Sequence, residues 1–111
     1  GQFLKALALG ADAVFIGTAA LVGLVHTQSE KILPWEPPTV LVYNVGHSSD
    51  KFDIEAGAKS LANFLRSCNS EMQEFAAAMG RSHINQINKT DLCSIHPQLA
   101  KIAGVDLAWQ P

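Results

Sequence analysis

Charged residues are scarce in this chain of 111 residues, because Asp, Glu, Lys and Arg make up 16% of it against 48% for the hydrophobic residues. A disordered segment or a charged tail has the opposite balance, so the composition excludes both. The eight basic residues are scattered along the chain, and the formal net charge is −2. Because nucleic acids and anionic membranes are bound through clustered basic residues, we expect the chain to bind neither.

The sequence also lacks a long apolar run and a cysteine motif. Its longest apolar stretch, residues 13–25, is interrupted by glycines and is too short to span a bilayer. Cys68 and Cys93 form no Cys-x-x-Cys pair, so we expect both to be small buried hydrophobes in a reducing compartment. The four histidines have no metal-ligand spacing. We therefore expect a cytoplasmic protein without a metal site.

The N-terminal part has the pattern of consecutive elements of an α/β protein. Residues 2–9 predict a helix with its apolar side chains on one face and a glycine stop. Residues 13–16 are continuously apolar, as in a strand buried on both faces of a parallel sheet. Gly17 and Thr18 then open a second helix over 19–26. This order of elements is typical of α/β proteins.

Residues 27–52 have a different character. Three prolines between residues 34 and 38 exclude a helix interior. Residues 39–45 have the β-branched and aromatic content of a strand, and a turn follows at 46–50. We interpret this part as an irregular, extended excursion between two helical parts.

The strongest pattern in the sequence lies between Asp53 and Gly80. Apolar residues recur there in alternating steps of four and three, which predicts one helix capped by Asp53 and ended by Gly80. Two interpretations stay open, because the apolar seam can pack on the rest of a larger domain or pair with a second copy as a coiled coil. The seam consists of Ile54, Ala58, Leu61, Leu65, Cys68, Met72, Phe75 and Met79.

Two shorter helices are predicted after this one. Ser82 is placed to cap a turn that runs to Ile87. Pro97 is placed at the first position of a helix that ends at Gly104. Residues 105–109 then form an extended or docking tail.

Gly17 and Thr18 form the candidate binding site. A glycine after a buried strand lets the backbone approach a ligand closely, and the following helix N-terminus offers free N–H groups with a partial positive charge. Such a site suits a phosphate, which (β/α)₈ barrels frequently bind in the loops after strands seven and eight. The local pattern alone supports a phosphate site and a turn that binds nothing equally. No catalytic triad or acid–base pair of carboxylates can be assembled, so we predict no catalytic residue.

Residues 5–14 and 16–21 resemble the last βα unit of FMN-dependent barrels, and the FMN-binding glutamate synthase family in particular. A complete (β/α)₈ barrel needs roughly 250 residues. The resemblance therefore implies an α/β fragment, namely the end of an FMN-binding (β/α)₈ barrel in residues 1–26. The excursion of residues 27–52 and a mainly helical C-terminal extension in residues 53–111 would follow it.

The resemblance also implies a role for the Gly-Thr turn. Gly17 and Thr18 would hold one side of the FMN phosphate, together with backbone N–H groups of Ala19 and Ala20. The other phosphate loop of the family, a Gly-Gly-x-Arg stretch, would lie just before Gly1. The larger protein would be an oxidoreductase that forms glutamate reductively from 2-oxoglutarate and ammonia-derived nitrogen, with the flavin as the redox group.

As a fragment, the chain is expected to be inactive alone and to bind FMN weakly or not at all. Its partners would be the rest of the barrel or an electron-donor protein. Apolar faces that a barrel would cover are expected to make the fragment a homo-oligomer.

Two alternatives and one departure from the family stand beside this interpretation. FMN-dependent 2-hydroxy-acid oxidases have a similar first helix, but they usually carry Gly-Arg where this chain has Gly17 and Thr18. A non-catalytic helical module for assembly or subunit contact would also explain the long seam. Many glutamate synthases carry three cysteines soon after the turn for an iron–sulfur cluster, and residues 23–28 contain none.

Overall fold

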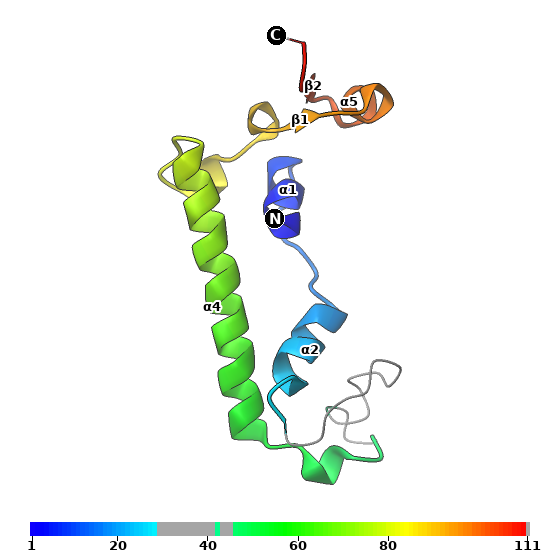
Figure 1. The fold of residues 1–111 in the computed structure, drawn as a ribbon, viewed down its shortest axis with the longest axis vertical. Coiled ribbons are helices and arrows are strands. Elements are labelled where there is room, and N and C mark those ends of the chain that lie inside the picture. Colours follow the sequence, from blue (N-terminus) through cyan, green and yellow to red (C-terminus); the bar gives the residue numbers. More distant parts are fainter. Residues whose placement is uncertain (29–41, 43–45, 111) are drawn as a thin grey trace. The chain divides into compact units, whose positions relative to one another are not determined.

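The computed structural model describes residues 1–28, 42 and 46–110 of the chain. The described elements are mostly helices (Figure 1). The chain divides into two compact units, a terminal unit of Gly1–Val14 with Asn69–Pro111 and a central unit of Phe15–Cys68. The long helix α4 (Ile54–Ala78) contributes residues to both units.

The core of the terminal unit begins with helix α1 (Gln2–Ala8), which forms where the sequence predicts it. Leu4 and Ala8 lie on its inner face and are 7% and 2% exposed. They pack with Ala76 of α4 and with Ile87 in one hydrophobic cluster. Partly buried hydrophobic residues complete this cluster, namely Met72, Met79, Ile84 and Leu92.

Helix α4 has the predicted start and stop. The Asp53 carboxylate accepts a hydrogen bond from the Ala56 N–H at 3.0 Å, so Asp53 caps the helix. At the other end Gly80 has a φ of +72°, which glycine adopts without strain. The Arg81 N–H then donates to the Ala76 carbonyl at 2.8 Å, and this bond closes a left-handed glycine stop.

The inner face of α4 in the central unit matches the predicted seam only in part. Leu61 of the seam lies 3.5 Å from the Cβ position of Gly23 in the second helix of this unit, but Ile54 and Leu65 of the seam are 71% and 42% exposed. The fully buried residues of α4 here are the small ones, Gly57 and Ser60, because a second helix packs closely against α4 and the distance between packed helices depends on the side chains at the contact. The periodicity of the large apolar residues therefore predicted the helix correctly and its inner face only in part.

In the terminal unit the seam is kept only in part. Met72 and Met79 pack against the hydrophobic cluster, whereas Phe75 is 49% exposed. The seam is thus not continuous along α4.

The turn after α4 also differs from its prediction. The 3₁₀ helix η2 (Ile84–Gln86) begins after His83, and the Ser82 side chain does not cap it. Instead the Gln86 side-chain oxygen accepts from the N–H groups of Ser82 at 2.9 Å and His83 at 3.3 Å. The turn is therefore capped by a glutamine that reaches back to the N–H groups before it, and not by a serine that accepts from the N–H groups after it.

The C-terminal part forms a small βαβ unit that the sequence did not predict. Its two short strands pair in parallel, with Cys93 opposite Asp106. The helix between them begins with Pro97 and ends at Gly104, as predicted, and the tail at 105–109 contains a strand in place of an unpaired segment. The elements are β1 (Cys93–Ser94), α5 (Pro97–Ala103) and β2 (Asp106–Leu107), after the 3₁₀ helix η3 (Lys89–Asp91).

Three further predictions concern strands and buried residues. Residues 13–16 form no strand, and Phe15 is 103% exposed, because a strand needs a neighbour and the described residues supply none there. The strand predicted over 39–45 lies outside the described residues except for Val42, which is helical. Both cysteines are free, but Cys93 is exposed and Cys68 is half-buried, so the prediction that both are buried is wrong. Cys93 lies on a two-residue strand, which is too short to be enclosed by a sheet.

No helix in the described ranges has the length and apolar character needed to cross a membrane.

Candidate functional site

The candidate site is the turn at Gly17, which leads into helix α2 (Thr18–Val25) of the central unit. Gly17 has a φ of +57° and a ψ of −132°, a conformation that residues with a side chain rarely adopt. Apart from Gly17 and its two chain neighbours, none of the described residues has an atom within 4 Å of the position that a Cβ would take at Gly17. The glycine is therefore required for the direction of the backbone, and the backbone around it is open to a ligand.

The first turn of α2 presents free donors. Within the described residues, the N–H groups of Thr18 and Ala19 have no acceptor, and both residues are exposed. The Ala20 N–H donates to the Gly17 carbonyl at 3.1 Å and closes the turn. No acidic residue lies in this turn to cancel the partial positive charge of the helix N-terminus. Of the predicted residues, Gly17, Thr18 and Ala19 thus offer open backbone, and Ala20 is already bonded.

Helix α2 packs against the first half of α4 in the central unit. The Ser60 hydroxyl donates to the Gly23 carbonyl at 2.7 Å, and Ser60 is only 6% exposed. At Gly57 a Cβ would stand 2.6 Å from Cζ of Phe52 and 3.2 Å from the carbonyl oxygen of Leu24. Gly57 is therefore what allows the two helices to approach so closely. We call this arrangement the α2–α4 contact.

Two more side chains hold the C-terminal end of α2. Gln28 donates from Nε2 to the Asp53 carbonyl at 3.0 Å and accepts from the Asp53 N–H at 2.9 Å, so both groups of its buried amide are bonded. His26 lies with Nδ1 at 3.2 Å from the Gly23 carbonyl oxygen and at 3.2 Å from the Ser60 hydroxyl. A histidine at the C-terminus of a helix is favourably placed toward the negative end of the helix dipole.

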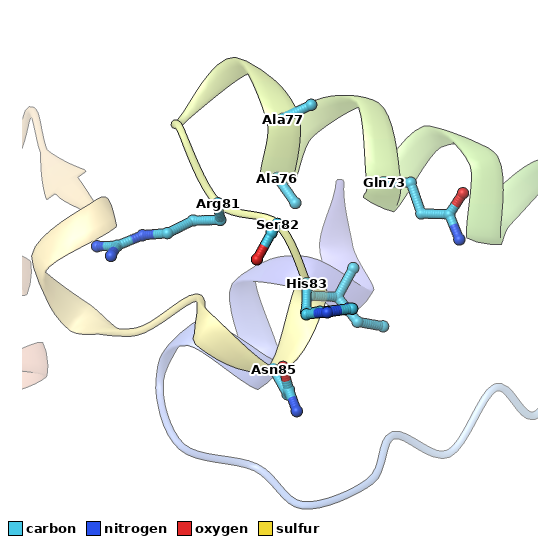
Figure 2. A pocket seen from close by; sticks show the side chains of 8 residues that line it. Gln73, Ala76, Ala77, Arg81, Ser82, His83 and Asn85 are labelled. Atoms are coloured by element: carbon cyan, nitrogen blue, oxygen red, sulfur yellow. The ribbon is translucent and has the colours of Figure 1, made fainter.

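A pocket of about 640 Å³ lies where α4 ends, in the terminal unit, and Figure 2 shows the side chains that line it. The Arg81 guanidinium turns away from the pocket and binds Asp91, and the Ser82 hydroxyl donates to the Gln86 side-chain oxygen at 3.1 Å. The Arg81 guanidinium and the Ser82 hydroxyl are therefore both engaged within the chain. No group of three or more His, Cys, Asp and Glu side chains in the described parts could hold a metal ion. The pocket is lined by Gln73, Ala76, Ala77, Arg81, Ser82, His83, Ile84 and Asn85.

Arg81, which lines this pocket, forms an ion pair with Asp91. Arg81 donates from Nε and Nη2 to one Asp91 oxygen at 3.2 and 2.8 Å, and the Asn88 N–H donates to the other at 3.0 Å. The Asp91 side chain is only 9% exposed. The hydrogen bond from Arg81, followed by that from the Asn88 N–H, lowers the pKa of the Asp91 carboxyl from its ordinary value.

Acid is therefore expected to destabilise the terminal unit through Asp91. A carboxyl whose pKa is lowered by folding stabilises the folded state above its unfolded pKa, and this stabilisation is lost as the pH falls through the folded pKa. We expect Asp91→Asn to lower the urea midpoint at neutral pH, and the difference from the unsubstituted chain to shrink as the pH falls below the ordinary aspartate range. Asp12→Asn, at an exposed carboxyl, is the control. A difference between Asp91→Asn and the unsubstituted chain that stays constant with pH would contradict this role.

A family model described as "Conserved region in glutamate synthase" matches residues 2–82. The chain belongs to the glutamate synthase family. The matched residues include helix α1, the Gly17 turn, helix α2 and all of helix α4. The open turn and the α2–α4 contact that holds its helix therefore both lie in the conserved region of the family.

The chain is similar to several curated relatives in this family. It is 34% identical to a glutamate synthase large subunit-like protein of Rhizobium meliloti (strain 1021), over 96% of the chain and 28% of the relative. It is 38% identical to an archaeal glutamate synthase (NADPH) of Archaeoglobus fulgidus, over 76% of the chain and 16% of the relative. It is 32% identical to an archaeal-type glutamate synthase (NADPH) of Thermotoga neapolitana, over 96% of the chain and 22% of the relative. The chain thus spans between 16% and 28% of the length of these relatives. No solved structure matches it.

Proposed function

We propose that this chain is the C-terminal part of an FMN-dependent oxidoreductase of the glutamate synthase type and supplies one half of the FMN phosphate site. The observation that carries the proposal is the open turn, where Gly17 leaves the backbone clear and Thr18 and Ala19 have free N–H groups within the described residues. Free N–H groups at a helix N-terminus suit the phosphate of FMN. Ala20 contributes by closing the turn, and its N–H reaches a phosphate only by sharing its bond to Gly17.

The residues around the turn support a place at the end of a (β/α)₈ barrel. Residues 13–16 are apolar and Phe15 is fully exposed, as expected of a strand whose neighbours belong to the rest of the protein. Helix α2 consists almost entirely of apolar residues, and its Val22 is 48% exposed. A helix that is apolar all round is usually enclosed by a larger structure. Self-association of the chain through these faces, as predicted from the sequence, belongs to the same proposal.

The chain corresponds to only a small part of its longer relatives, so we expect it to carry only part of the enzyme's functions. When bound, FMN supplies the redox chemistry of reductive glutamate formation. The residues of this chain bind and orient the phosphate end of the cofactor, and the groups that meet 2-oxoglutarate and the flavin ring are expected in the rest of the protein. The relatives named as NADPH-dependent glutamate synthases are about four to six times longer than the part that this chain matches, which supports this division.

Inorganic phosphate tests the half-site in the chain itself. We expect phosphate, compared with sodium chloride at equal ionic strength, to shift the ¹H–¹⁵N signals of Thr18 and Ala19 with an affinity in the millimolar range, because a half-site offers few donors. Gly17→Ala is expected to weaken this response, since its backbone conformation is strained by about 1–3 kcal/mol for a residue with a Cβ.

Gly10→Ala is the matched control, because Gly10 also has a positive φ, with no atom within 4 Å of its Cβ position, but lies outside the central unit. Phosphate shifts that are absent from Thr18 and Ala19 would contradict the site. Micromolar binding of FMN by the chain alone, with a shifted flavin spectrum, would contradict the claim that the rest of the protein is required.

A further inference from the structure

We infer that Ser60 of α4 is a positioning residue for the phosphate-binding end of α2, an inference that rests on the proposed function above. Ser60 touches neither Gly17 nor the free donors, and it would act through the Gly23 carbonyl. Ser60 on α4 would thus set the direction of α2, the helix proposed to bind the cofactor phosphate.

The phosphate end of α2 has few contacts among the described residues. None of their side chains caps the first turn, and none of their atoms, apart from those of Gly17 and its two chain neighbours, lies within 4 Å of the Cβ position at Gly17. Helix α2 has eight residues and is therefore a rod of about 12 Å. Among the described residues, the close contacts of this rod with α4 lie at its other end, and these contacts set its direction. In α2 those contacts are the ones made by Gly23, Leu24, His26 and Gln28.

The hydrogen-bond donors of the Gly23 carbonyl are side chains and not N–H groups of the helix backbone. The last four carbonyls of any helix lack intrahelical partners, and Gly23 is among the last four residues of α2. The Gly23 carbonyl oxygen accepts a hydrogen bond from the Ser60 hydroxyl at 2.7 Å, and Nδ1 of His26 lies 3.2 Å from the same oxygen. Loss of the hydroxyl would leave a buried carbonyl with one weaker partner, which favours movement of α2 away from α4.

Ser60 lies where α2 and α4 are in close contact. Gly57, one turn earlier on α4, has no room for a Cβ between Phe52 and the Leu24 carbonyl. Ser60 is the next buried residue of α4 and carries a hydroxyl instead of an apolar group. A buried hydroxyl that bonds across a close helix contact fixes the register of the two helices, because a shift of either helix breaks the bond.

Phosphate affinity in Ser60 variants tests the inference. In Ser60→Ala we expect the phosphate affinity at Thr18 and Ala19 to fall by about fivefold, because the lost hydrogen bond lowers the share of chains with α2 in its binding direction. We also expect the Ala20 N–H, which closes the first turn, to exchange several times faster with solvent in the ligand-free chain. Ser67→Ala is the control, since Ser67 is an exposed serine on the same helix.

Ser60→Cys and the comparison with Gly17→Ala separate the possible outcomes of this experiment. Ser60→Cys keeps a donor at this position, although the thiol is larger and a weaker donor than the hydroxyl, so we expect an intermediate affinity. If Ser60→Cys binds as tightly as the unsubstituted chain, packing and not the hydrogen bond positions α2, and the inference is overturned. If Gly17→Ala weakens phosphate binding but Ser60→Ala behaves like Ser67→Ala in affinity and in Ala20 exchange, the site stands and the positioning role is wrong. If no phosphate response appears at all, the proposed function fails, and the Ala20 exchange rate still decides whether Ser60 controls the first turn.

Discussion

Ile87→Ala is expected to lower the free energy of unfolding of the terminal unit by about 2–3 kcal/mol. Ile87 is 6% exposed and packs in one cluster with Leu4, Ala8 and Ala76, so it joins the segment after α4 to both helices of the core. Its truncation removes buried apolar surface from both contacts. The measurement is urea denaturation followed by the amide signals of the terminal unit.

The expected value lies in the lower half of the usual range for such truncations. Ile87 borders an apolar pocket of about 300 Å³, so the space left by its side chain opens onto that pocket and is not sealed as a new cavity. Ile95→Ala is the matched control, because Ile95 is 80% exposed in the same unit and its truncation should change stability by less than about 0.5 kcal/mol. Equal effects of the two substitutions would mean that the cluster does not stabilise this unit.

The sequence carried enough information to locate the helices but only part of their inner faces. Asp53, Gly80, Pro97 and Gly104 act through local geometry, and each one begins or ends a helix as predicted. The inner face of a helix depends on what packs against it. In the central unit helix α2 packs closely against α4. The residues of α4 that are buried there are the small Gly57 and Ser60, whereas Ile54 and Leu65 of the predicted seam are exposed.

Strands were predicted less well for a related reason. The strands β1 and β2 have two residues each, and their pairing depends on helix α5 bringing them together. Two residues are too few for an alternating pattern to be recognised. Residues 13–16 show the opposite error, since a strong apolar run does not form a strand where no neighbour is present among the described residues.

The candidate site was partly visible in the sequence. Gly17 and Thr18 were singled out because a glycine before a helix has a local physical meaning, and the structure gives Gly17 a positive φ that the sequence analysis did not predict. The residues that hold the helix, Gly57 and Ser60, were missed. The sequence pattern gave no distinctive signal for them, since α4 also carries several other alanine and serine residues.

Gly57→Ala is expected to destabilise the central unit by about 1–3 kcal/mol, although alanine is the better helix former. The new Cβ would stand 2.6 Å from Cζ of Phe52 and 3.2 Å from the carbonyl oxygen of Leu24. The Phe52 ring must shift to make room for this methyl group. The Leu24 carbonyl is part of the α2 backbone, so relief of that contact moves α2 as a whole. We expect the urea midpoint of the central unit to fall.

Gly23→Ala is the matched control, because it places the same methyl group on the other helix of the same contact. Its Cβ would meet Phe64 at 3.4 Å and Leu61 at 3.5 Å, which are ordinary van der Waals distances. There the gain in helix propensity, up to about 1 kcal/mol, is not offset by overlap, so we expect no loss of stability. Opposite effects at the two glycines would show that Gly57 is required for the close approach of the helices and not for backbone freedom. If both substitutions stabilise the unit, then α2 and α4 are not held at the distance described, and the positioning role of Ser60 loses its basis.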